Sequence, residues 1–270
     1  MNARHELPGS PELSIDAIAE LYERLVLANN TECYTHRYDG YDFVARFGLD
    51  AAHYLDFPRL ITILEFERIV AERGLRAIRM LMVNGGPEGD PELACIESDE
   101  IDRIDFEVDP RRHDLHVLEV DRTDYDFVLM SQTLEHLYDP VRALRNLASV
   151  MRPGGFLWTS VPTVSFQHSL PAHFSTGFTP IGLVCLCEQV GLTTVEVGQW
   201  GNAKYIGCLF DLGIIPGYFD LRPASLRARG PAHVLRALWR LPIRNFLCDG
   251  THNDFTIPVQ TWVLAQKPAV

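Results

Sequence analysis

The sequence has no cysteine pattern of a zinc site and no basic residue in its most glycine-rich stretch. No CxxC pair occurs among its six cysteines, which lie at positions 33, 95, 185, 187, 208 and 248. This spacing predicts no metal site and favours free thiols in a reducing cytoplasm. The stretch MVNGGPEGD, residues 82–90, contains no lysine or arginine. Because phosphate-binding loops use a cation, we expect this stretch to bind no phosphate group.

A long apolar run and an N-terminal secretory signal are also missing. The longest apolar stretch, residues 205–219, is interrupted by Asp211 and Pro216 and is too short to span a bilayer. The first residues, MNARHELPGSPEL, include no apolar signal core. We therefore expect a soluble, cytoplasmic protein with no membrane partner.

Basic residues are fewer than acidic residues. The chain carries 24 basic and 36 acidic residues, a net charge of -12. Such a charge repels a polyanion, so nucleic acid is not an expected partner. The arginines between residues 222 and 244 are interpreted as the solvated face of a helix.

Two periodicities alternate along the chain. Apolar residues at helical spacing predict helices that begin behind Ser10, at about residue 56, at Pro140 and at Thr179. Short apolar runs predict strands at residues 77–83, 101–108, 115–120, 125–131, 155–162, 193–199 and 260–266. Strands that alternate with helices predict an α/β fold with a parallel sheet.

The ends of the predicted strands carry the candidate binding residues. Ligands of open α/β sheets lie at the carboxyl ends of the strands, where the strand order reverses. Here these ends carry Asn84-Gly85-Gly86, Glu107, Asp121 and Ser131-Gln132. Acids beside a glycine turn suit a ligand with hydroxyl groups and a positive centre. Glu107 is preferred over Asp105 and Asp109 as the acceptor for two ribose hydroxyls; the alternative is a solvated strand end.

Residues 125–162, YDFVLMSQTLEHLYDPVRALRNLASVMRPGGFLWTSVP, carry the most specific signal. Their strand, EH-x-x-DP turn, amphipathic helix and PGG stop closely resemble the fourth and fifth strands of class I S-adenosylmethionine-dependent methyltransferases. Residues 173–192, with the FTP sequence before a helix, resemble the next helix of that family. The resemblance runs from about Leu75 to Val197 and resumes at the final strand.

The resemblance implies a fold, a cofactor and site residues. The implied fold is a three-layer, Rossmann-like, seven-stranded and mostly parallel sheet with an antiparallel final strand. The predicted domains are an N-terminal helical and aromatic cap, residues 1–74, and a methyltransferase-like domain, residues 75–270, with an insert at about 199–255. The implied cofactor is S-adenosyl-L-methionine. Its predicted binding residues are Asn84, Gly85, Gly86, Gly89, Glu107, Asp121, Ser131 and Gln132.

The chain departs from the family pattern in two places. Val83 stands near the position where the family carries an acid before its glycine loop. The stretch between Gly85 and Asp126 is also short, so any helices beside the second strand must be very short or missing.

The implied reaction is methyl transfer, which needs a general base only when the acceptor loses a proton. Candidate bases are His173, preferred, and His168, because an imidazole titrates near neutral pH. A polar loop histidine is the alternative for each. His136 is expected to stabilise the turn that contains it.

The acceptor is expected to be a small molecule bound outside the family-like region. Candidate substrate-binding residues are Tyr38, Tyr41, Trp200, Asn202, Tyr205 and His252. Aromatic side chains with a few polar groups are typical of small-molecule pockets, although the same aromatics could equally pack in the core. A homodimer or a partner subunit is possible. The alternative function is a methyltransferase-fold protein without methyl-transfer activity, acting as a partner subunit or in another reaction.

Overall fold

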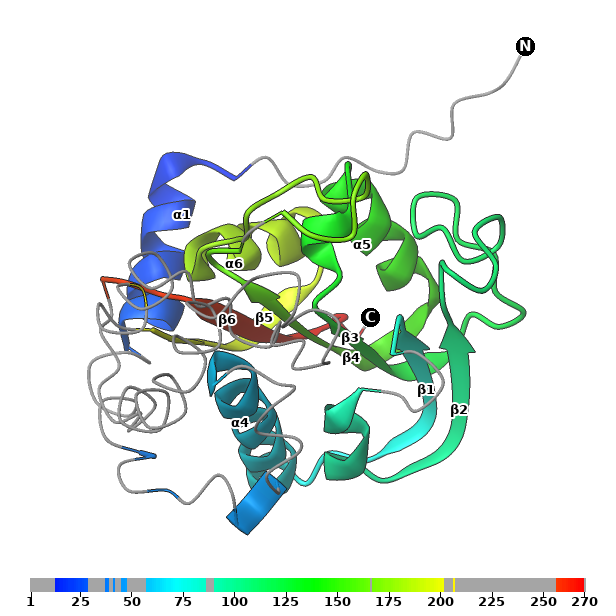
Figure 1. Cartoon of the computed structure of the whole chain (residues 1–270), viewed down its shortest axis with the longest axis horizontal. Helices are drawn as coiled ribbons and strands as arrows, with labels where there is room; N and C mark the ends of the chain where they lie inside the picture. The colour runs from blue at the N-terminus through cyan, green and yellow to red at the C-terminus, as the bar shows by residue number, and fades with distance from the viewer. Residues whose placement is uncertain are drawn as a thin grey trace, which may run out of the picture.

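The computed structural model describes residues 13–28, 37–38, 41, 45–47, 57–85, 90–165, 167–201, 206 and 256–269. Its centre is a six-stranded sheet in the order β2-β1-β3-β4-β6-β5 (Figure 1). The strands are β1 (Ala77–Val83), β2 (Ser98–Ile104), β3 (Tyr125–Ser131), β4 (Met151–Pro162), β5 (Thr193–Trp200) and β6 (Gln260–Gln266).

The strand directions agree with the predicted sheet. β1 pairs in parallel with β2 and β3, and β3 pairs in parallel with β4. The final strand, β6, is antiparallel to both of its neighbours, β4 and β5. The mostly parallel sheet with an antiparallel last strand is thus confirmed.

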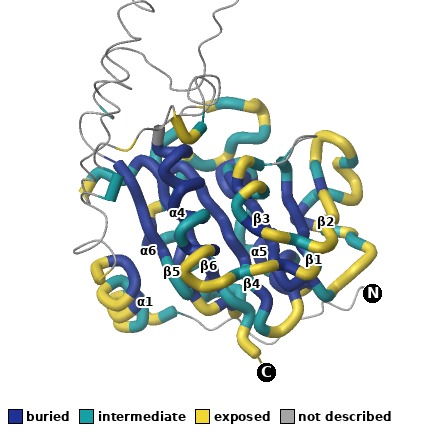
Figure 2. Tube along the Cα trace, turned by 90° about the horizontal axis from the view of Figure 1, so that it is seen from below, coloured by how far each residue is buried: buried dark blue, intermediate teal, exposed yellow. Residues whose placement is uncertain are grey.

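The prediction of seven strands is wrong for the described chain, because residues 115–120 form no strand. This segment is held beneath a helix instead of joining the sheet edge. Asn146 Nδ2 donates to the Leu115 carbonyl at 2.8 Å, and the Asp139 N–H donates to His116 Nε2 at 3.3 Å. The His116 ring also stacks on Tyr138, with centroids 3.8 Å apart. β2 therefore forms the sheet edge, with most of its residues exposed (Figure 2).

One face of the sheet is covered by α4 (Phe57–Arg73), which confirms the helix predicted there. Its buried side packs on aromatic and apolar strand residues. The ring centroid of Phe66 is 4.8 Å from that of Trp158 and 6.0 Å from that of Phe127. Trp262 of β6 belongs to the same buried cluster. Burial of these large rings stabilises the layer, since each removes well over ~100 Å² from water.

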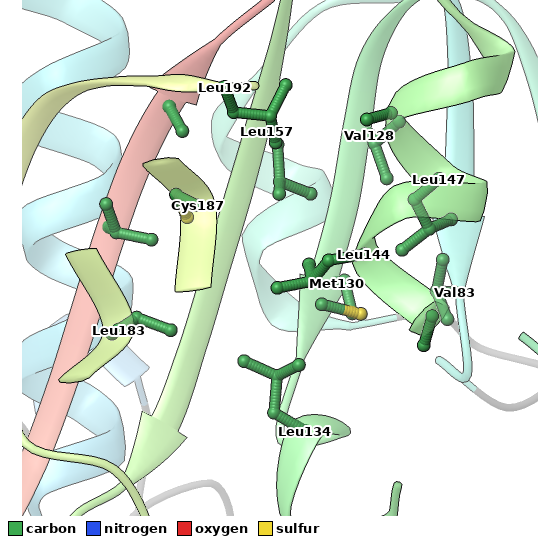
Figure 3. Close-up of a cluster of buried hydrophobic side chains, with 14 of the residues drawn as sticks. Val83, Val128, Met130, Leu134, Leu144, Leu147, Leu157, Leu183, Cys187 and Leu192 are labelled. Atoms are coloured by element: carbon green, nitrogen blue, oxygen red, sulfur yellow. The ribbon is translucent and has the colours of Figure 1, made fainter. Parts of the chain in front are cut away.

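The other face is covered by α5 (Pro140–Val150) and α6 (Pro180–Gln189), with α1 (Ile15–Leu21) beside α6 (Figure 1). Side chains from α5 and α6 meet those of β1, β3 and β4 in a second buried cluster (Figure 3). It includes Leu144 and Leu147 of α5, Leu183 and Cys187 of α6, and Val128 of β3. Helices on both faces give the predicted three layers.

The helix starts follow capping chemistry. The Asp139 side chain accepts from the Arg142 N–H, and the Thr179 side chain accepts from the Gly182 N–H, each followed by a proline at the first helical position. α1 begins later than predicted from Ser10, because Ser14 is its N-cap and accepts from the Ala17 N–H at 3.1 Å. The chain then continues as a π-helix, Tyr22–Leu27.

The helices on either side of β2 are very short or missing, as the sequence predicted. A five-residue 3-10 helix, η2 (Pro91–Cys95), precedes β2. Residues 105–124, between β2 and β3, contain turns and bends but no helix. No helix within the described ranges is both long and apolar enough to cross a membrane.

Candidate functional site at the carboxyl ends of the strands

The strand order reverses between β1 and β3. The chain leaves β1 for β2 on one side and returns to β3 on the other side. Because β1, β2, β3 and β4 are parallel, their carboxyl ends meet at one edge. This is the topological switch point at which α/β sheets bind ligands.

Two non-glycine residues at this edge adopt left-handed backbone conformations. Asn84, directly after β1, has a φ of 58°, and Gln132, directly after β3, has a φ of 50°. The Asn84 N–H donates to the Ile104 carbonyl at 2.8 Å, and the Gln132 N–H donates to the Ser160 carbonyl at 2.8 Å. Such conformations are uncommon outside glycine and cluster at functional sites. The residue after each of these strands is thus fixed by a hydrogen bond to a neighbouring strand.

The predicted cofactor residues of β1 and β2 have different surroundings. Gly85 follows Asn84 at the edge, whereas Gly86 and Gly89 lie outside the described residues. Glu107 is exposed in the turn after β2, and its N–H donates to Asp105 Oδ1 at 2.9 Å. The same turn is tied to β1, because the Phe106 N–H donates to Asn84 Oδ1 at 3.2 Å.

Asp121 does not end a strand, since none forms before it. Its exposed carboxylate accepts from Arg112 Nη2 at 2.9 Å. Its proximity to an adenine amino group remains a prediction.

Ser131, by contrast, belongs to a buried polar network. Its hydroxyl donates to Glu92 Oε1 at 2.8 Å, and Arg59 Nη2 donates to Glu92 Oε2 at 2.6 Å. A second, shorter contact joins Arg59 Nη1 to Glu92. Arg59 Nη1 and Gln132 Nε2 each lie 3.3 Å from the Ser160 hydroxyl. Side chains from α4, η2, β3 and β4 thus converge on the switch-point edge.

Asp90 lies at the border of this network with an unsatisfied oxygen. Its Oδ1 is 3.6 Å from Arg59 Nη2, while its buried Oδ2 has no hydrogen-bond partner in the described part of the chain. Burial raises the pKa of Asp90 above its ordinary range, against the lowering effect of Arg59. The oxygen is therefore available to a donor group of a ligand.

The network residues on α4 and η2 were missed at the sequence level. Arg59 and Glu65 are charged residues beside the apolar stripe of α4, and this is the signal that could have indicated buried ion pairs. Val83, which stands near the family's acidic position, is fully buried in the core. Glu92 brings a carboxylate to the same edge from the other side of the glycine turn.

Three histidines gather beyond β3 and β4. His136 ends η3 (Leu134–His136), and His168 and His173 lie in the loop between β4 and α6. Burial lowers the pKa of His136 and of His173, and the neighbouring imidazoles lower each further. The two predicted bases, His173 and His168, lie beside each other and beside His136, which was predicted to stabilise the turn.

Glu135 is a buried carboxyl group beside these histidines. Its Oε1 lies 3.9 Å from His136 Nε2, and its Oε2 has no hydrogen-bond partner among the described residues. Burial raises the pKa of Glu135 to about 7. The group was not predicted as a site residue, although it stands directly before His136 in the EH pair.

The predicted substrate residues that the structure describes pack against the protein itself. The Tyr38 hydroxyl donates to Glu65 of α4, and the Tyr38 ring meets Tyr41 edge to face at 5.9 Å. Trp200 is buried in the cluster under α4. Asn202, Tyr205 and His252 lie outside the described residues. Substrate contact by any of the six stays a prediction.

Part of the chain matches a known family of domains. Residues 86–197 match a model described as a methyltransferase domain. The resemblance to class I S-adenosylmethionine-dependent methyltransferases is thereby confirmed. The match begins at the glycine turn and ends within β5, so it contains the carboxyl ends of β2, β3 and β4 but not β1.

Solved methyltransferase structures give weaker similarity. Phosphoethanolamine N-methyltransferase 2 of Haemonchus contortus, with S-adenosyl-L-methionine, is 14% identical, with a TM-score of 0.46 over 76% of this chain and 52% of that one. The chain thus spans about half of that enzyme. N-methyltransferase NodS of Bradyrhizobium japonicum, with S-adenosyl-L-homocysteine, is 13% identical, with a TM-score of 0.44 over 78% and 88% of the two chains.

A third structure has a small-molecule acceptor. The 1,6-didemethyltoxoflavin-N1-methyltransferase of Burkholderia thailandensis is 15% identical, with a TM-score of 0.42 over 84% of this chain and 86% of that one. A search of curated proteins gave no match.

Proposed function

We propose that this chain transfers a methyl group from S-adenosylmethionine to a small-molecule acceptor. The observation that carries the proposal is that the methyltransferase-domain match, residues 86–197, contains the ends of β2, β3 and β4 at the switch point. When bound, the cofactor supplies an electrophilic methyl group on a sulfonium. The acceptor class rests on the acidic net charge of -12, which disfavours a nucleic acid.

The residues present at the edge fit this cofactor. Its amino-acid end carries an ammonium and a carboxylate, and the edge offers the free oxygen of Asp90 beside the guanidinium of Arg59. In the proposal Asn84, Gly85, Gly86 and Gly89 bind through the backbone of the turn. Glu107 accepts from the ribose, Asp121 lies near the adenine, and Ser131 and Gln132 lie beneath the methionine part.

The catalytic contribution of the chain is placement and proton transfer. Holding the acceptor in line with the methyl group and excluding water accounts for most of the rate. For an acceptor that must lose a proton, His173 is the proposed base and His168 the second candidate. The proposed acceptor contacts are Tyr38, Tyr41, Trp200, Asn202, Tyr205 and His252.

A second candidate function is a methyltransferase fold without methyl transfer. Two observations favour it: the apolar Val83 beside the glycine turn, and the very short or missing helices on either side of β2. Such a protein would act as a partner subunit or in a different reaction.

Cofactor binding separates the two functions. Thermal unfolding is measured with S-adenosylmethionine and with S-adenosylhomocysteine, since a ligand of the folded state raises the melting temperature. Affinity is then measured by calorimetry. We expect Glu107→Ala to weaken binding by about 1.5–3 kcal/mol, the cost of unpaired ribose hydroxyls.

Two variants serve as comparisons. Asp99→Ala changes an exposed carboxylate at the opposite end of β2 and should leave affinity unchanged. Asp105→Ala tests the neighbouring acid. If cofactor affinity falls in Asp105→Ala but not in Glu107→Ala, the ribose contact is assigned to Asp105 instead. Failure of both ligands to bind at millimolar concentration would exclude methyl transfer and favour the second candidate.

A further inference from the structure

The three histidines beyond β3 and β4 form one compact cluster. Ring centroids of His136 and His168 are 4.7 Å apart, those of His168 and His173 are 4.7 Å apart, and those of His136 and His173 are 5.6 Å apart. One nitrogen from each ring lies within 4.8 Å of the other two. The cluster therefore presents three potential ligand atoms to one point in space.

His136 has the orientation expected of a metal ligand. Its Nδ1 lies 2.5 Å from the Ala172 carbonyl oxygen. A carbonyl only accepts hydrogen bonds, so Nδ1 carries the proton and Nε2 keeps its lone pair. Metal-binding histidines are usually fixed in this way, with the other ring nitrogen bonded to a backbone carbonyl or a carboxylate.

His173 supplies an independent observation. Both of its ring nitrogens are buried, and neither has a hydrogen-bond partner within the described ranges. Buried polar nitrogens normally have a partner, and each exception needs an explanation. Edge-to-face contact among the rings explains their proximity but leaves these two nitrogens unsatisfied. A cation between the three rings would satisfy one of them.

The loop that carries His168 and His173 is fixed to η3. The N–H groups of Phe174 and Ser175 donate to the Glu135 carbonyl at 2.9 and 3.2 Å. Within the loop, the Ala172 N–H donates to the Ser169 carbonyl at 3.0 Å. The backbone that follows Glu135 and the backbone around His173 are thus held together before any ligand binds, which lowers the entropic cost of binding.

We infer that His136, His168 and His173 bind one divalent transition-metal ion. Neutral imidazoles suit Zn²⁺, Cu²⁺, Fe²⁺ and Ni²⁺ rather than Mg²⁺ or Ca²⁺. Tetrahedral zinc with Zn–N distances of ~2.1 Å places ligand nitrogens about 3.4 Å apart. Small side-chain rotations bring nitrogens separated by up to 4.8 Å to that spacing.

Three protein ligands leave one position of a tetrahedral ion open. Zinc sites with three protein ligands and an open position are the catalytic kind, whereas structural sites have four. The carboxyl group of Glu135 lies close to this site, with its Oε1 3.9 Å from His136 Nε2. A water or an acceptor hydroxyl is the ligand of suitable chemistry.

A bound ion would change the proposed role of the histidines. Their lone pairs would be used for coordination, so neither His173 nor His168 could accept a proton. The cation would instead lower the pKa of a bound hydroxyl, whose proton leaves to solvent. This use of the ion rests on the proposed methyl transfer, but the binding of the ion does not.

The test is metal binding by the full chain, expressed without a histidine tag and stripped with EDTA. Co²⁺ is titrated and followed by its visible absorption, and Zn²⁺ is then added as a competitor. We expect one ion per chain, displaced by Zn²⁺. His168→Ala and His173→Ala should each weaken binding at least about tenfold, since even outer-sphere changes cost 10–100-fold.

His113→Ala is the matched control, because His113 lies outside the cluster and its ring Nδ1 contacts the Asp105 backbone instead. It should bind as wild type does. Thermal unfolding of each variant without metal confirms that it folds. Equal Co²⁺ affinity in wild type, His168→Ala and His173→Ala would overturn the inference. So would a double variant, His168→Ala/His173→Ala, that binds Co²⁺ as tightly as wild type does.

Failure of the metal site and failure of the proposed methyl transfer give different results. Metal titration is carried out without cofactor, and cofactor binding is measured in EDTA. A chain that binds S-adenosylmethionine but no stoichiometric metal contradicts only the metal site. A chain that binds metal but not S-adenosylmethionine contradicts only methyl transfer.

Discussion

Two buried carboxyl groups at the strand ends are compensated differently. Glu92 is fully buried, but the Arg59 guanidinium and the Ser131 hydroxyl satisfy it. Glu135 is equally buried, and its Oε2 has no partner in the described chain. An unpaired buried carboxylate is costly, so the neutral form of Glu135 is favoured. Glu92 thus has an arginine and a serine as hydrogen-bond partners, whereas Glu135 Oε2 has none among the described residues.

This difference predicts a pH-dependent stability. The pKa of Glu135 is raised to about 7 in the folded protein and is about 4.3 in an unfolded chain. Between these values the folded state binds more protons, so stability falls as pH rises through this window. The contribution amounts to at most about 3.7 kcal/mol, since each pKa unit corresponds to about 1.36 kcal/mol. Glu135→Gln mimics the protonated form, so this variant should lack the pH-dependent contribution of Glu135 to the free energy of unfolding.

The measurement is urea unfolding of metal-free protein at pH 5 and pH 8. The free energy of unfolding of wild type should fall relative to Glu135→Gln between the two pH values. Glu119→Gln, which changes an exposed carboxyl group, should follow wild type. Parallel pH dependence in wild type and Glu135→Gln would show that Glu135 titrates normally.

At the scale of elements, the loop between β4 and α6 depends on one glycine. Gly177 has a φ of 142°, and an added Cβ would lie 2.0 Å from the Pro162 carbonyl oxygen. The next residue, Phe178, donates its N–H to the same carbonyl at 3.0 Å. The loop thus returns to the end of β4 at a place where no side chain fits.

Gly177→Ala should therefore destabilise the protein and displace the loop. We expect a loss of about 3 kcal/mol or more in the free energy of unfolding, from backbone strain and from the contact with Pro162. Gly191→Ala is the control, because Gly191 has a φ of 80° but open space around it. It should cost only about 1–2 kcal/mol. Equal losses in urea unfolding would contradict close packing of the loop at Gly177.

Elements with local signals were predicted well, and those that depend on neighbours were not. α5 and α6 each have a capping side chain and a proline at the first helical position, and both were located to within about two residues. Residues 115–120 look like a strand by composition. Their fate was decided by Asn146 and Asp139, which hold Leu115 and His116 beneath α5.

At the scale of the molecule, the last strand completes the sheet. β6 lies between β4 and β5 and pairs with both, and Trp262 within it is fully buried. Removing residues 256–270 would leave two unpaired strand edges and remove part of the core under α4. We expect this truncated chain to be insoluble or unfolded by circular dichroism and gel filtration.

A shorter truncation provides the matched control. Lys267 Nζ donates to the Ala148 and Met151 carbonyls at 2.8 Å each. A chain that ends at Lys267 keeps these bonds and all of β6, so it should fold as the full chain does. A folded, soluble protein without residues 256–270 would show that the sheet does not require β6.

The sequence by itself determined the alternation of helices and strands, the strand ends near which the site lies, and the methyltransferase resemblance. These depend on periodicity, capping residues and a contiguous motif, all of which are local in the chain. Only the tertiary structure decided which side chains meet. Arg59 reaches Glu92, and His136 joins His168 and His173, because the parallel sheet brings the ends of distant segments to one edge. Periodicity shows which face of an element is buried, but the neighbours on that face depend on strand order and packing.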